Sequence, residues 1–159
     1  MNEIERMLKL PIRLNYPLPG LLKEVLYGTL NRARIQTDVD GMVKAVAWGF
    51  KSWEDQTWGI GMSRDQVQPA FVRMLAIAVP DLFVVAHDKE AFKGYKLDED
   101  EQEVLADARE TFQAKVAIAQ VLHQHGKAFN FADFIRESPE FKRAVEQRDA
   151  ASPRRLVRH

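Results

Sequence analysis

The sequence contains no cysteine among its 159 residues. This absence excludes disulfides, thiolate zinc sites, iron–sulfur clusters and cysteine nucleophiles. It suits a reducing compartment, so we expect a cytoplasmic protein. A hydrophobic core then has to stabilise the fold, and a chain of this length can bury enough apolar surface to do so as one domain.

Long apolar runs are also missing. The most apolar stretch, residues 74–86, is interrupted by Pro80 and Asp81 and is too short and too polar to span a bilayer. Glu3 and Glu5 precede any apolar run at the start of the chain, which is unlike a secretory signal. We therefore expect a soluble protein without a membrane segment. Its 46% hydrophobic and 29% charged residues are typical of a globular domain.

The chain has no excess charge, since Lys plus Arg and Asp plus Glu number 23 each. This balance argues against a protein whose whole surface binds nucleic acid. The charges are distributed unevenly, with 7 acidic and 3 basic residues over 96–126, and 8 basic and 5 acidic residues over 127–159. Residues 152–159, SPRRLVRH, include three arginines and no acid. Any phosphate-binding surface is therefore expected to be local.

Apolar residues recur at spacings of three and four, which predicts amphipathic helices. Side chains suited to capping precede several of them, namely Thr37, Ser63, Asp81, Asp98 and Ser138. The run 82–85 also fits a strand, but the sequence offers no second strand to pair with it. We predict an all-α, compact bundle of about six to eight helices over residues 1–150, followed by a basic tail at 151–159. The predicted helices cover 2–9, 18–35, 37–53, 63–79, 82–92, 98–125, 131–137 and 138–149.

The longest predicted helix covers residues 98–125. The acidic residues from Asp98 to Glu103 lie at its positive end, where they indicate capping and a solvated face rather than a calcium loop. Ile118 and Val121 broaden the apolar stripe in its second half. We therefore expect the first half to face water and the second half to be buried on two sides.

Catalytic and metal-binding patterns are scarce. His123 and His125 are two apart, so on a helix they point about 160° from each other and cannot share one metal ion. His87 beside Asp88 and Glu90 is the other acid–histidine cluster, and its spacing matches no known metal motif. No serine lies in a nucleophile elbow, and no glycine-rich phosphate loop is present. We predict no metal, no cofactor and no enzymatic activity; a small enzyme that uses His87 or His123 with nearby carboxylates is the alternative.

Aromatic residues provide the candidate binding surfaces. Trp48, Trp53 and Trp58 recur every five residues and cannot share one helix face. We expect Trp48 in the core, and we assign Trp53 and Trp58 to a partner-binding surface, with local packing as the alternative. Three phenylalanines on short C-terminal helices form a second candidate surface, because short helices need a docking surface, either the long helix or a partner. They are Phe131, Phe134 and Phe141.

Two functions follow from these patterns. The leading hypothesis is a non-enzymatic protein-binding or assembly protein that uses these aromatic residues to bind a protein partner or a second copy of itself. The alternative is a helical accessory subunit of a nucleic-acid complex. In that case Arg154, Arg155 and Arg158 contact phosphates or an acidic partner.

Overall fold

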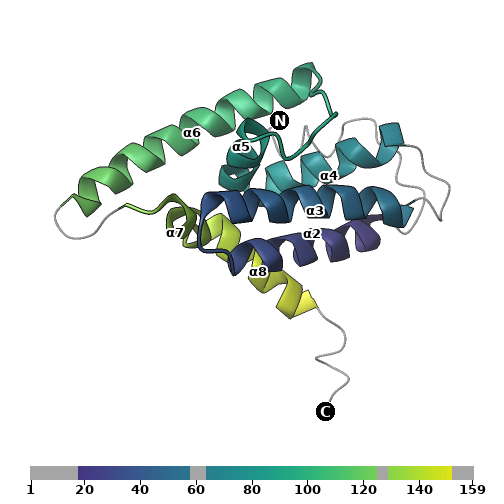
Figure 1. Ribbon diagram of the computed structural model, residues 1–159, viewed down its shortest axis with the longest axis horizontal. Helices are drawn as coiled ribbons and strands as arrows, with labels where there is room; N and C mark the ends of the chain where they lie inside the picture. The colour runs from purple at the N-terminus through teal and green to yellow at the C-terminus, as the bar shows by residue number, and fades with distance from the viewer. Residues whose placement is uncertain (1–17, 58–63, 125–128, 152–159) are drawn as a thin grey trace, which may run out of the picture.

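The computed structural model describes residues 18–57, 64–124 and 129–151, and this part of the chain is helical, without strands (Figure 1). The predicted all-α bundle, with one long helix and short C-terminal helices, is confirmed. The predicted helix at 2–9 lies outside the described residues. The seven helices in the described part are α2 (Leu18–Arg34), α3 (Val39–Thr57), α4 (Arg64–Ala78), α5 (Pro80–Asp88), α6 (Glu99–His123), α7 (Phe131–Arg136) and α8 (Pro139–Ala151).

Helices α2 and α3 lie side by side at the centre of the bundle, and the other helices pack around them (Figure 1). α4 and α5 pack against α3, α6 packs against α5 and α4, and α8 packs against α2. One continuous hydrophobic cluster contains residues from every one of these helices. The aromatic centre of this cluster is Phe50, whose ring lies 5.8 Å from Phe71 and 5.4 Å from Phe92, in edge-to-face geometry.

The close approach of α2 and α3 depends on Gly49. A Cβ atom at this position would overlap the hydroxyl of Thr29 and would lie 2.9 Å from its Cβ atom. The Thr29 hydroxyl donates a hydrogen bond of 2.9 Å to the carbonyl of Val25, so it is satisfied within its own helix. A residue without a side chain therefore allows the two central helices to pack closely.

Two predicted helix caps are wrong. Asp38, rather than Thr37, caps α3, because its carboxylate accepts a 2.7 Å hydrogen bond from the amide of Gly41. α5 has Val79 at its N-cap without a side-chain hydrogen bond. Asp81, which we expected to cap α5, instead lies buried in the first turn of that helix. Its carboxylate faces the interior, where it forms an ion pair with a side chain of α6.

Two other caps are confirmed. Asp98 and Glu101 form a capping box at the start of α6, in which each side chain accepts a hydrogen bond from the backbone amide of the other. The Ser138 hydroxyl accepts a 3.2 Å hydrogen bond from the amide of Phe141 in the first turn of α8. Ser63, the remaining predicted cap, lies outside the described residues.

The expectation for the two halves of α6 is wrong. Its first half is the packed half, and Glu101 is buried rather than solvated. Ile118, Val121 and Leu122 in the second half are 63, 60 and 73% exposed. The reason is length: α6 spans about 38 Å, whereas α5, its main support, spans about 14 Å. The last turns of α6 therefore extend beyond the body of the bundle (Figure 1).

Trp48, expected in the core, is 41% exposed. The guanidinium of Arg32 lies 3.8 Å from the centre of its ring, a cation–π contact between α2 and α3. Phe50, two residues further along α3, points into the core instead. The aromatic spacing identified the helix but not which of its aromatic residues is buried.

Candidate binding groove along the long helix

Two adjoining cavities of about 390 and 260 Å³ form a groove beside α6, here named the α6 groove. They adjoin because Asp81 and Lys115 line both of them. One side of the groove is α6, from Val104 to His123, and the other side combines the α4–α5 junction with α7 and the start of α8. The residues that line it are Ala76, Ile77, Pro80, Asp81, Val104, Asp107, Ala108, Thr111, Lys115, His123, Phe129, Asn130, Asp133, Phe134, Glu137, Ser138, Pro139 and Glu140.

One end of the α6 groove is aromatic. The ring of Phe134 lies 5.8 Å from that of Phe112 on α6 and 5.7 Å from that of Phe129. Phe129 also contacts Phe131 at 4.7 Å and His123 at 6.1 Å. The side chain of Asn130 caps α7 by accepting hydrogen bonds from two backbone amides, which fixes this short helix in place. Through these contacts, α7 forms part of the aromatic end of the groove.

Apolar side chains continue from this end along the last turns of α6. Residues 116–122, VAIAQVL, include no charged side chain. Ile118, Val121 and Leu122 are exposed there, and Phe131 on α7 is 40% exposed. Ile118, Val121 and Leu122 lie on α6 between Lys115 and His123, which line the groove. Exposed apolar side chains beside a hollow are typical of a site that binds another molecule.

A partly buried ionic cluster forms the middle of the α6 groove, and we name Asp81, Lys115 and Glu140 the floor cluster. The ammonium of Lys115 lies 2.6 Å from Oε1 of Glu140 and 3.5 Å from Oδ2 of Asp81. The side chain of Asp81 is only 4% exposed. Oδ2 of Asp81 and Oε2 of Glu140 are both buried and have no hydrogen-bond partner among the described residues. The cluster therefore holds two carboxylates and one cation, with Oδ2 of Asp81 in an ion pair with Lys115 and Oε2 of Glu140 without a donor among the described residues.

The protonation of the floor cluster follows from its burial. Burial raises the pKa of Asp81, with Glu140 adding to the effect and Lys115 opposing it. Burial opposes ionisation of Glu140 as well, but the hydrogen bond from Lys115 lowers the pKa of Glu140. For Lys115 burial again opposes the charge, yet its two carboxylate neighbours raise the pKa of the ammonium. Lys115 and Glu140 are thus a charged pair, and Asp81 is the carboxyl group with the weakest support.

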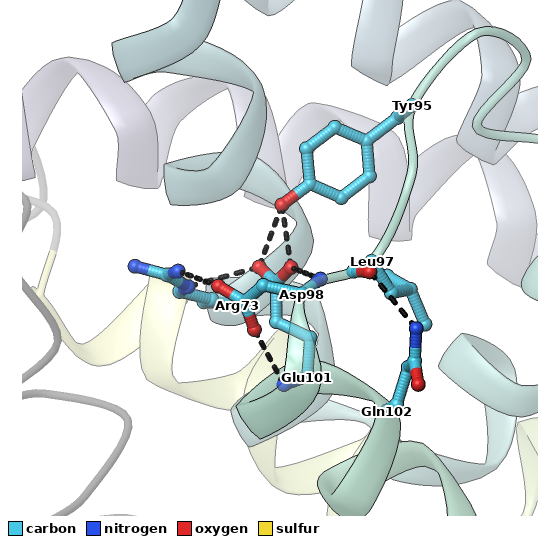
Figure 2. A network of polar contacts seen from close by, with 6 residues as sticks. All are labelled: Arg73, Tyr95, Leu97, Asp98, Glu101 and Gln102. Carbon is cyan, nitrogen blue, oxygen red and sulfur yellow. Dashed lines mark hydrogen bonds and ion pairs between the residues drawn. The ribbon is translucent and has the colours of Figure 1, made fainter.

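A second buried ionic cluster lies at the other end of α6, and its groups all have partners (Figure 2). Arg73 on α4 donates to Glu101 at 2.9 Å and to Asp98 at 2.8 Å. The hydroxyl of Tyr95 donates to the Glu101 carboxylate at 2.6 Å. Burial, followed by the hydrogen bond to Glu101, raises the pKa of Tyr95, which keeps the hydroxyl protonated. This cluster ties the start of α6 to α4 and has a structural role.

The structure brings two of the predicted partner-binding residues to the α6 groove. Phe134 lines it and Phe131 lies beside it. Phe141 is buried in the core and offers no surface to a partner. Trp53 belongs to α3, and nothing is described of its side chain. The remaining predicted residues, Trp58, Arg154, Arg155 and Arg158, lie outside the described part of the chain.

The predicted histidines separate in the structure. His123 lines the aromatic end of the groove, whereas His87 on α5 lies 3.6 Å from Asp88, outside both cavities. Within residues 18–57, 64–124 and 129–151, no group of three or more His, Asp or Glu side chains is arranged to hold a metal ion.

Sequence reasoning missed the floor cluster. The signal that pointed to it was Asp81, a charged residue inside the most apolar stretch of the chain. Its partner Lys115 is 34 residues away, and Glu140 is a further 25 residues along. Only the packing of α5, α6 and α8 brings the three together.

Across the helices that the structure describes, none is both long enough and apolar enough to cross a membrane. Comparisons of this chain with known protein families, with curated proteins and with solved structures give no match. What the protein does therefore has to be argued from the α6 groove itself.

Proposed function

We propose that this chain is a protein-binding or assembly protein and that the α6 groove is its binding surface. The observation that carries the proposal is the exposure of Ile118, Val121 and Leu122, which lie on α6 between two residues that line the groove, Lys115 and His123. Exposed apolar surface costs about 25 cal/mol per Å² relative to the same surface buried. A partner that covers these side chains would recover that free energy.

The shape of the groove supports a helical or extended polypeptide as the bound partner. From Val104 to His123 the groove follows α6 for about 28 Å, which is the length of five helical turns. Amphipathic helices bind in this manner, with apolar residues at spacings of three and four along a hydrophobic groove. An ionic cluster in the middle of such a groove would fix the register of the partner.

The charges of the α6 groove favour a protein partner over nucleic acid. Five carboxylate side chains line it and one lysine does, and phosphates would be repelled by that excess. The carboxylates are Asp81, Asp107, Asp133, Glu137 and Glu140. A nucleic-acid partner would have to bind elsewhere on the chain.

The test replaces Ile118 and Leu122 together by glutamine. Both side chains are exposed, so the double variant should keep the stability of the wild type. Ile35→Gln is the matched control, because Ile35 is 70% exposed at the end of α2, outside the groove. Proteins that the chain captures from the host are purified. Each of them, and the chain itself, is then titrated calorimetrically against the wild type, the double variant and Ile35→Gln.

We expect the double variant to bind the partner, or a second copy, at least about tenfold more weakly, since central apolar contacts dominate interface affinity. Ile35→Gln should bind like the wild type. Equal affinities for all three forms would contradict the proposal, as would a chain that binds neither a host protein nor itself.

A further inference from the structure

We infer that an exposed surface of the two central helices is a binding site for single-stranded nucleic acid. The site consists of Arg32 on α2 and of Lys44, Trp48 and Lys51 on α3, and we name these four residues the Trp48 surface. None of them lines the α6 groove, so the inference is independent of the proposed function. Two observations carry it: an exposed stacked pair of side chains, and cations around that pair without carboxylate partners.

The centre of the Trp48 surface is a layered pair of flat groups. The central carbon of the Arg32 guanidinium lies 3.8 Å from the centroid of the Trp48 ring, so the guanidinium lies over a face of the ring. The ring reaches α2 at Gly28, where an added Cβ atom would lie 3.9 Å from it. Trp48 is nevertheless 41% exposed, and Arg32 is exposed as well. A flat surface that combines an aromatic ring with a cation is therefore open to solvent.

Two lysines flank Trp48 on the same side of α3. Lys44 precedes it by four residues and Lys51 follows it by three, which are the spacings of neighbouring side chains on a helix surface. Both lysines are exposed, and they lie about 10 Å apart along the helix axis. In the described part of the chain, neither of them nor Arg32 forms an ion pair with a carboxylate. Three positive charges around one ring are therefore available to an anionic partner.

This combination of groups matches the chemistry of a single nucleic-acid strand. Phosphates would pair with the cations, and unpaired bases are flat rings that stack on aromatic side chains and on guanidinium planes. A duplex offers the same phosphates but keeps the faces of its bases stacked inside. An acidic peptide would pair with the cations but would leave the flat surface of the stacked pair unused. Glu54 and Asp55 follow Lys51 in the sequence, so the basic surface ends at Lys51 and the site is short.

The test measures the binding of a short fluorescein-labelled oligothymidylate to the full-length chain by fluorescence anisotropy. We expect binding at low salt that weakens as salt is added. The logarithm of the association constant should fall against the logarithm of the salt concentration with a slope of about −2, because three cations release counterions from a single strand. The same DNA as a duplex, and polyglutamate, should each bind at least about fivefold more weakly, because neither offers unstacked bases.

Two changes to the stacked pair test the stacking. Trp48→Leu removes the aromatic ring without changing the charge, and it should weaken binding of the oligothymidylate about tenfold. Trp48→Phe keeps a smaller ring and should lose less. Circular dichroism reports whether each variant is folded. If Trp48→Leu does not fold, Arg32→Gln decides the question, because it removes the other member of the pair and should weaken binding at least about fivefold.

Two double variants separate this surface from general electrostatics. Lys44→Gln with Lys51→Gln should weaken binding at least about tenfold at low salt and should flatten the salt dependence. Lys93→Gln with Lys96→Gln is the matched control, because it removes two exposed lysines outside the Trp48 surface and changes the net charge equally. The control variant should bind like the wild type.

Absence of binding to the oligothymidylate at low salt would overturn the inference. Equal losses in the two double variants would overturn it as well, because charge alone would then explain the binding. Unchanged binding by a folded Trp48→Leu, or equal binding of polyglutamate or of the duplex, would show that no base stacks on the surface. The Ile118 and Leu122 double variant should bind the oligothymidylate normally, so a failure here leaves the proposed function of the α6 groove intact.

Discussion

Asp81 has a buried carboxylate whose charge the free chain stabilises incompletely. Burial raises its pKa, Glu140 raises it further, and Lys115 compensates only in part. At neutral pH the ionised side chain therefore costs stability. A carboxylate with such a cost is a candidate for a binding role, because a partner that supplies donors would remove the cost on binding.

Replacing Asp81 by asparagine tests this cost through its pH dependence. The ordinary pKa of 3.8 applies to the unfolded chain, and the folded pKa lies above it. Between the two values the folded chain holds more protons, so the wild type loses stability as pH rises through that window. Asp81→Asn lacks this titration. Its free energy of unfolding, relative to that of the wild type, should therefore increase as the pH rises from below 3.8 to neutrality. Urea unfolding across that range measures the difference, and a relative gain by the wild type would refute the assignment.

α6 is held firmly at one end only. Its first turns have the capping box and the buried Arg73–Glu101 ion pair, whereas its last turns extend past the bundle. The sequence was sufficient to predict the helix, its bounds and the role of Asp98, because caps and periodicity are local properties. It could not predict which half is covered, since Ile118 and Val121 match the periodicity of a buried helix whether or not a neighbour is present. Burial depends on where α5 ends, which is a property of the tertiary packing.

Glu101→Gln tests the attachment of α6 to α4. The change keeps the shape of the side chain but removes the charge of Glu101, the more deeply buried of the two carboxylates that contact the guanidinium of Arg73. Breaking a buried pair in this way costs about 3 kcal/mol or more in the free energy of unfolding. Glu99→Gln, an exposed change in the same first turn, should cost less than about 1 kcal/mol. Denaturant unfolding compares them, and similar losses for the two variants would disprove a structural role for the pair.

At the scale of the whole molecule, one hydrophobic cluster unites all seven described helices. The sequence predicted the all-α class, because helix periodicity is encoded locally. Of the three phenylalanines that it assigned to partner binding, two lie at the groove and Phe141 is buried in the core. The sequence did not predict the floor cluster, whose three residues come from α5, α6 and α8. That residues 1–150 form a single domain stays a prediction, which the shared core supports.

A single shared core predicts cooperative unfolding. We expect tryptophan fluorescence, far-UV and near-UV circular dichroism to give coincident urea transitions with one midpoint. Trp48, at the contact of the central helices, reports on the α2–α3 pair, whereas far-UV circular dichroism reports on all helices. Two separated midpoints would mean that part of the bundle folds on its own.

The contact between Gly49 and Thr29 also has an evolutionary consequence. A larger residue at position 49 would push the two central helices apart, and every other helix packs on that pair directly or through one neighbour. Substitutions there should be purged whatever the partner of the protein is. Diverged sequences should therefore keep a glycine on α3, twenty positions after a small hydroxyl residue on α2. This pair would still mark common ancestry after most surface identity is lost.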